Sequence, residues 1–93
     1  MIGLAKGQQI FDKIKVQSKM GHGTLYLLNT GISFEASGSG LCLELDYGEI
    51  LYSSTAKKDS LVISWTEGVA TYDIKFNIKN AAEVVQKINQ YKK

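Results

Sequence analysis

The sequence predicts a mainly β fold, in which seven strands form a partly open barrel of two packed antiparallel sheets capped by a C-terminal α-helix. Short apolar runs alternate with polar residues and are separated by turns from about residue 10 to residue 76. The apolar spacing then becomes helical over about 79–91. Because a flat sheet of short strands exposes unpaired edges, we expect the strands to fold into two layers and the helix to plug the open side.

The composition is that of one globular domain spanning residues 1–93, with 44% hydrophobic and 22% charged residues. The formal net charge is only +2 and all 11 basic residues are lysine, so we expect no nucleic-acid partner. A single cysteine excludes an intrachain disulfide. No apolar run approaches the roughly 20 residues of a membrane span, which predicts no transmembrane segment. We therefore expect a cytoplasmic protein, which could also lie at the periphery of a membrane.

The first strand is expected at residues 10–18. Residues 1–9 show no periodicity and are interpreted as a loose N-terminal arm. Ile14 and Val16 then fall on one face of the chain and Lys13 and Lys15 on the other, which is the pattern of a half-buried strand. Residues 20–23, Met-Gly-His-Gly, are predicted to be a turn.

The next two strands form the clearest hairpin of the chain. Apolar runs at residues 24–28 and 32–35 flank Asn29-Thr30-Gly31. A glycine at the end of so short a connection suggests a positive φ, so Gly31 is predicted to be the turn residue of a tight β-hairpin.

Four further strands are predicted from alternating residues, with small or charged residues between them. They are expected at residues 41–45, 50–55, 61–65 and 70–76. In the last of these, the residues expected to face inward are Ala70, Tyr72, Ile74 and Phe76. Thr71, Asp73 and Lys75 should face water.

The C-terminal helix is predicted from one apolar stripe, formed by Ala81, Val84, Val85, Ile88 and Tyr91. Asn80 followed by Glu83 resembles a capping box, and Asn77 is an alternative cap one turn earlier. Val85 and Ile88 are the residues expected to plug the barrel.

Residues 23–35, Gly-Thr-Leu-Tyr-Leu-Leu-Asn-Thr-Gly-Ile-Ser-Phe-Glu, resemble the second and third strands of GRAM, GLUE and bacterial PH-like domains. The strand order and terminal helix are similar to the pleckstrin-homology (PH) superfold over residues 10–91. The resemblance implies that fold, and GLUE or GRAM membership would imply ubiquitin or lipid partners. The arginine-containing signature of lipid-binding PH domains is absent, so no family binding motif is transferred to residues of this chain.

Two lysine-rich regions are the candidate binding site. The resemblance implies that they can flank an anion site on the outside of the barrel, with His22 at its rim. The lysines are Lys13, Lys15 and Lys19 in or after the first strand, and Lys57 and Lys58 in the turn before the strand at 61–65. The alternative interpretation is a solvated strand face and a charged turn that blocks edge pairing.

Tyr26 is the remaining candidate. It alternates with Leu25 and Leu27 on a strand that is apolar on both faces. Either the strand is covered on both sides, or one face is an interaction surface.

The sequence predicts no enzyme and no cofactor. A catalytic thiol at Cys42 would need a histidine partner, and His22 lies in a glycine-rich segment. One cysteine and one histidine also do not make a zinc site. Trp65 and Tyr72 share their phase with apolar neighbours, which favours core packing over base stacking.

We therefore expect a non-catalytic binding or scaffolding module that mediates protein–protein interaction or homo-oligomerisation. The binding surface would be a β-edge or the region beside the C-terminal helix. The alternative is peripheral binding of acidic lipid headgroups through the lysines.

Overall fold

The computed structural model describes residues 6–19, 21–38, 40–57 and 59–92. Met20, Ser39 and Lys58, for which a turn, a loop and a binding role are predicted, lie outside these residues. The side chains of Leu41, Cys42 and Ala56 also lie outside the described part of the chain.

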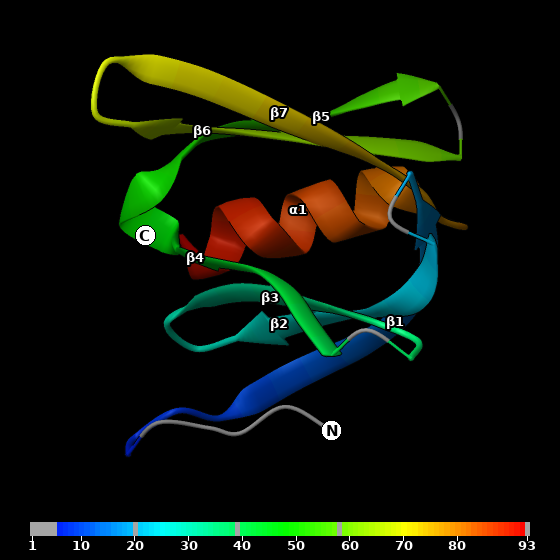
Figure 1. Ribbon diagram of the computed structural model, residues 1–93, viewed down its shortest axis with the longest axis horizontal. Coiled ribbons are helices and arrows are strands. Elements are labelled where there is room, and N and C mark those ends of the chain that lie inside the picture. Colours follow the sequence, from blue (N-terminus) through cyan, green and yellow to red (C-terminus); the bar gives the residue numbers. More distant parts are fainter. Residues whose placement is uncertain (1–5, 20, 39, 58, 93) are drawn as a thin grey trace.

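Seven antiparallel strands and an α-helix form the described fold (Figure 1). The strands are β1 (Ile10–Ser18), β2 (Gly21–Leu28), β3 (Gly31–Ala36), β4 (Gly40–Asp46), β5 (Ile50–Lys57), β6 (Ser60–Glu67) and β7 (Ala70–Asn77). A 3₁₀ turn, η1 (Tyr47–Glu49), joins β4 to β5, and α1 (Ala81–Tyr91) follows β7. The predicted mainly β class, strand order and C-terminal helix are confirmed.

The strands form one seven-stranded sheet in the order β4-β3-β2-β1-β7-β6-β5. It folds into two layers, and β1 joins β7 through the single described pair Gln17 and Asn77. Strands β4 and β5 lie at the two ends of this order, so the sheet is not closed. The structure is therefore a partly open barrel, as predicted, and β4 and β5 are its end strands.

The core lies between the two layers and under α1. Phe34 of β3 and Phe76 of β7 meet across it, with ring centroids 5.1 Å apart. Ile88 of α1 is fully buried in the same cluster, together with Val84. Val85 is only partly buried, so Ile88 is the stronger plug residue of the predicted pair. Burial of each large side chain contributes roughly 1.5–3 kcal/mol before entropy is subtracted.

Helix α1 begins differently from the prediction. Asn80 is the N-cap, but its backbone is left-handed, with φ of 58°, and its side chain makes no capping hydrogen bond. The Glu83 amide donates instead to the backbone carbonyl of Asn80. The predicted capping box is therefore wrong, and Asn77, the alternative cap, is the last residue of β7.

The β2–β3 hairpin forms at the predicted place, but Gly31 has another role. Gly31 is the first residue of β3 and does not have a positive φ. A Cβ atom at this position would collide with the carbonyl oxygen of Leu45 on β4. Gly31 is therefore required by the close approach of two backbones and not by the turn.

The predicted turn at residues 20–23 is also shorter in the structure. Gly21 pairs with Ser18, and His22 pairs with Gln17, so both residues are already in β2. The positive φ of Gly21 lets the chain reverse immediately after β1. His22 is therefore a strand residue.

Tyr72 is the other correction, because 46% of its surface is exposed. It has the inward phase of β7 and lies opposite Trp65, on whose ring it stacks at 5.9 Å. Ile74 and Phe76 on the same strand are buried as predicted. Its partner Trp65 is buried in the core, whereas Tyr72 packs on the Trp65 ring and stays partly exposed, so the correct phase did not bring burial.

Strand β2 is buried on both faces. Leu25 and Leu27 belong to the main core, whereas Tyr26 and Leu28 form a second cluster with Ile10 on the other face. The two alternatives left open by the sequence are therefore resolved in favour of a strand covered on both sides.

The described end of the N-terminal arm is attached to the β2–β3 connection through Asn29. The Asn29 side chain accepts a hydrogen bond from the Gln9 amide at 2.8 Å and donates to the Gly7 carbonyl at 2.9 Å. Residues 7–9 of the predicted loose arm are thus held by hydrogen bonds.

Candidate functional site

A groove between β1 and the segment after β7 brings together part of the predicted lysine site. It is open, has a volume of about 470 Å³, and includes Lys15, His22, Asp59 and Lys79 in its lining. It forms because β1 and β7 separate on one side of their pair at Gln17 and Asn77. We refer to it as the β1 groove.

The other described lysines of the predicted site do not line the β1 groove. Lys19 lines a second hollow of about 350 Å³ with Lys75 and Asp73. Lys13 is exposed on the outer face of β1, opposite Tyr26, and Lys57 is exposed at the end of β5. The structure thus joins Lys15 and His22 in one groove, whose lining does not include Lys13, Lys19 or Lys57.

Two lysines of these hollows, Lys75 and Lys79, were not among the predicted site residues. Lys75 was expected to face water, and Lys79 follows the same strand closely, so both could have been included once β7 was placed beside β1. Each hollow also contains a carboxylate, from Asp59 or Asp73. The local charge is therefore mixed.

Tyr26 offers little surface to a partner, because only 5% of it is exposed. Its hydroxyl donates to Glu35 Oε1 at 3.4 Å. Burial, followed by the nearby Glu35 carboxylate, raises the pKa of the Tyr26 phenol. The phenol therefore remains a neutral hydrogen-bond donor.

Strand β5, at one end of the sheet, carries two adjacent exposed apolar side chains. Leu51 is 49% exposed and Tyr52 is 53% exposed. Residues 50–56 include no charged residue, and Lys57 follows them. An edge strand leaves some of its backbone N–H and C=O groups facing outward, so this edge can pair with another strand.

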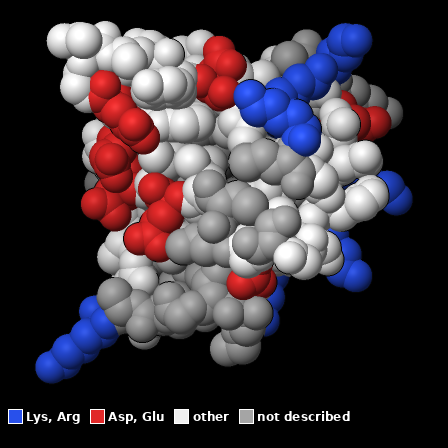
Figure 2. Space-filling view, in the orientation of Figure 1, with Lys and Arg blue, Asp and Glu red and all other residues white. Residues whose placement is uncertain are grey.

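The β4 edge differs from the β5 edge in charge. Glu44 and Asp46 are both exposed on β4, and Glu49 is exposed in η1. Figure 2 shows acidic side chains gathered on the left of the molecule, over the β4 and η1 region. Charged side chains of this kind disfavour the addition of another strand.

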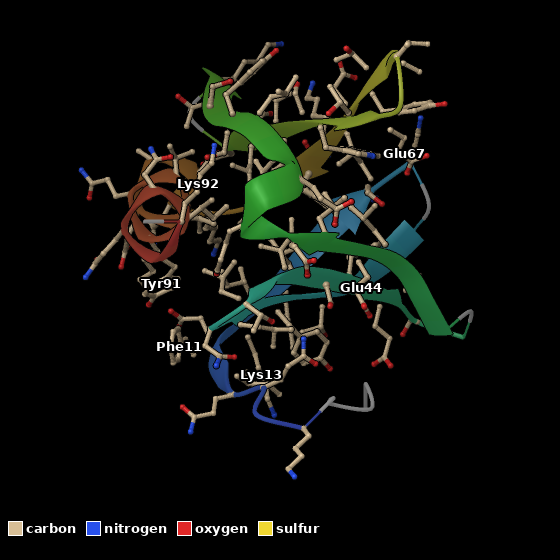
Figure 3. The ribbon with its side chains drawn as sticks, turned by 90° about the vertical axis from the view of Figure 1, so that its left-hand side faces the viewer. Phe11, Lys13, Glu44, Glu67, Tyr91 and Lys92 are labelled. Atoms are coloured by element: carbon tan, nitrogen blue, oxygen red, sulfur yellow. The ribbon has the colours of Figure 1, made fainter. Side chains whose placement is uncertain are left out.

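The C-terminal end of α1 lies beside β1 and β5. In Figure 3 Phe11 lies beside Tyr91, and their ring centroids are 4.9 Å apart. Lys87 Nζ is 3.0 Å from an Asp12 carboxylate oxygen, and this hydrogen bond raises the pKa of Lys87. Lys92 Nζ donates to the Leu51 carbonyl at 3.2 Å. These contacts attach the helix to both layers.

Leu51 and Tyr52 were not predicted as binding residues. Their strand was expected, but their exposure depends on β5 being an edge with a bulge between Ile50 and Tyr52. An alternation pattern does not reveal which strand ends a sheet.

No family model matches the chain, and no curated protein matches it significantly. The described residues contain no group of three histidine, cysteine or acidic side chains placed to hold a metal ion. None of the helices in the described part of the chain is long and apolar enough to cross a membrane.

Proposed function

We propose that this protein is a non-catalytic module with a PH-like fold that binds another polypeptide by strand addition at β5. The observation that carries the proposal is the half-exposed, uncharged edge at Leu51 and Tyr52. Seven antiparallel strands followed by a helix support the PH-like assignment. The burial of Tyr26 moves the expected interaction surface from β2 to β5.

The physical basis of binding would be backbone pairing along β5, with side chains of the partner packing on Leu51 and Tyr52. Main-chain hydrogen bonds supply affinity in this mode, and alternate side chains supply specificity. Such a partner would be an extended segment with few charges, because a charged side chain against Leu51 or Tyr52 would lose hydration without compensation.

The test uses immobilised protein and a lysate of the source cells. The double variant Leu51→Lys and Tyr52→Lys places two charges on the edge, and Val69→Lys is the matched control. Val69 is fully exposed in the β6–β7 turn and is not part of β5. We expect a polypeptide to be retained by the wild type and by the control but lost with the double variant. Hydrogen exchange of the complex should slow at β5.

Thermal unfolding checks that the double variant remains folded, which is expected because both substituted side chains are half-exposed. Equal retention of every bound polypeptide by the folded double variant would refute strand addition at β5. Protection of β4 instead of β5 in the complex would refute it as well.

We propose acidic lipid binding as the second function, since Lys15, His22 and Lys79 line one groove. Binding to vesicles containing phosphatidylserine should weaken steeply with salt. The Lys15→Glu and Lys79→Glu double variant should abolish vesicle flotation, whereas Lys6→Glu, outside the groove, should not. An absence of vesicle retention at low salt would eliminate this second function.

A further inference from the structure

We infer that the polypeptide bound by β5 is the β5 strand of a second copy, paired antiparallel about a twofold axis at Ser53. This inference rests on the proposed function and names its partner. Leu51 and Tyr52 of each copy would pack against the edge of the other.

The central part of β5 has the regular geometry that such pairing needs. Bulges interrupt its register with β6 between Ile50 and Tyr52 and between Thr55 and Lys57. Residues 52–55 between them run in unbroken register. Ser53 lies in this regular segment and is the midpoint between Glu49 and Lys57. A strand centred there can add to the edge without meeting a bulge at the axis.

The charges at the two ends of β5 favour a second copy in antiparallel orientation. Glu49 precedes the strand, Lys57 ends it, and both side chains are exposed. With the axis at Ser53, Glu49 before one β5 strand comes to the same end of the pair as Lys57 of the other, and symmetry brings these charges together twice. Parallel alignment would instead place like charges together. The strand is therefore complementary to itself in one orientation.

Helix α1 contacts β5 and β6, and its buried side chains face the core. Val84 and Ile88 belong to the core between the layers, and Figure 1 shows α1 lying between them. Lys92 at the end of α1 donates a 3.2 Å hydrogen bond to the Leu51 carbonyl of β5. An incoming strand would have to displace this exposed hydrogen bond.

The arrangement predicts a weak and closed dimer. An isologous contact uses the same surface on both copies, so it ends at two. One strand pair buries less than the roughly 1,200 Å² of a stable interface, and we expect a concentration-dependent equilibrium. The charged β4 edge leaves no second site for growth into a polymer.

Sedimentation equilibrium over a concentration series measures the dissociation constant. We expect a monomer–dimer equilibrium, with the Leu51→Lys and Tyr52→Lys variant raising the constant at least about tenfold and Val69→Lys leaving it unchanged. A wild-type protein that stays monomeric at every concentration would overturn the inference, as would a folded double variant that still dimerises normally.

A charge exchange tests the orientation. Glu49→Lys and Lys57→Glu should each raise the constant about threefold to tenfold, because like charges then face each other. The double exchange should return it to within about threefold of the wild type. Glu49 also accepts a hydrogen bond from the Asp46 amide. Both the Glu49→Lys variant and the double variant lack this hydrogen bond, so it cannot account for a dissociation constant that recovers in the double variant. Failure to recover would overturn the antiparallel register.

The two proposals can fail separately. A monomeric wild type that nevertheless captures another polypeptide through Leu51 and Tyr52 removes the second copy and keeps strand addition. A monomer that captures no polypeptide through these residues removes both. A dimer whose β5 amides exchange as fast as in the monomer would overturn the inferred interface.

Discussion

Strand β4 ends the sheet with exposed Glu44 and Asp46, whereas β5 ends it with half-exposed Leu51 and Tyr52 and no charge before Lys57. The backbone of β4 packs directly against Gly31 of the neighbouring strand β3. The β5 strand is covered on its inner side by α1. The difference shows that covering the face of a strand does not by itself protect its edge: β4 carries exposed acidic side chains within the strand, whereas the exposed charge of β5 is at its last residue, Lys57.

The support given to β5 by α1 can be removed with Ile88→Asp, for which we expect the largest effect. Ile88 is fully buried, and an aspartate there would be an unpaired charge in the core. We expect loss of cooperative folding and not local fraying of the helix. Far-UV circular dichroism and urea unfolding would measure it, with Gln86→Asp on the exposed side of α1 as the control.

A milder variant, Ile88→Ala, should cost about 2–5 kcal/mol of unfolding free energy, which a small domain could survive. If Ile88→Asp unfolds cooperatively with nearly wild-type stability, burial of α1 against the core does not stabilise β5.

The close packing of β4 can be disturbed with Gly31→Ala, for which we expect a loss of about 2–4 kcal/mol. The added methyl group would collide with the Leu45 carbonyl, so β4 would have to move away from β3. Gly48→Ala is the matched control, because a Cβ atom there meets nothing within 4 Å. Urea unfolding compares the two variants. Equal stability of both would mean that β4 moves without cost.

These glycines show how much of the fold the sequence predicts. Strand positions follow from local alternation, which is why all seven strands and the helix were expected. Gly31 could not be interpreted correctly because its requirement comes from Leu45, which is distant in the sequence. The exposure of Tyr72 was also not predictable, since alternation gives the face of a residue but not how much of that residue the rest of the fold covers.

The candidate site was less predictable than the fold. Lys15 and His22 were selected from the sequence, but their groove depends on where β1 separates from β7. Lys79 joins them only through that separation. Whether Leu51 and Tyr52 lie in an edge strand depends on the global order of strands. The same residues in a central strand would have a hydrogen-bonded strand on each side.

The connection between β4 and β5 can be weakened slightly with Tyr47→Phe. The buried Tyr47 hydroxyl donates to the Leu28 carbonyl at 2.6 Å. Loss of this hydrogen bond should cost about 1–2 kcal/mol of unfolding free energy, less than the disturbance at Gly31. Tyr52→Phe on the exposed edge is the control, and urea unfolding near neutral pH would measure both. A loss for Tyr52→Phe equal to that for Tyr47→Phe would contradict the assigned role of burial.

The Tyr47→Phe substitution should also change how stability depends on pH in alkaline solution. Burial, and then the nearby Tyr91, raises the pKa of Tyr47 from 10.0 to about 12. The folded protein therefore retains a proton that the unfolded chain loses, so this contribution to stability is complete below about pH 10 and disappears as pH rises through about 12. Tyr47→Phe should fall less steeply in that range, although the raised pKa of Tyr26 leaves some slope. Parallel stability curves for wild type and Tyr47→Phe would show that the Tyr47 phenol is not kept neutral by the fold.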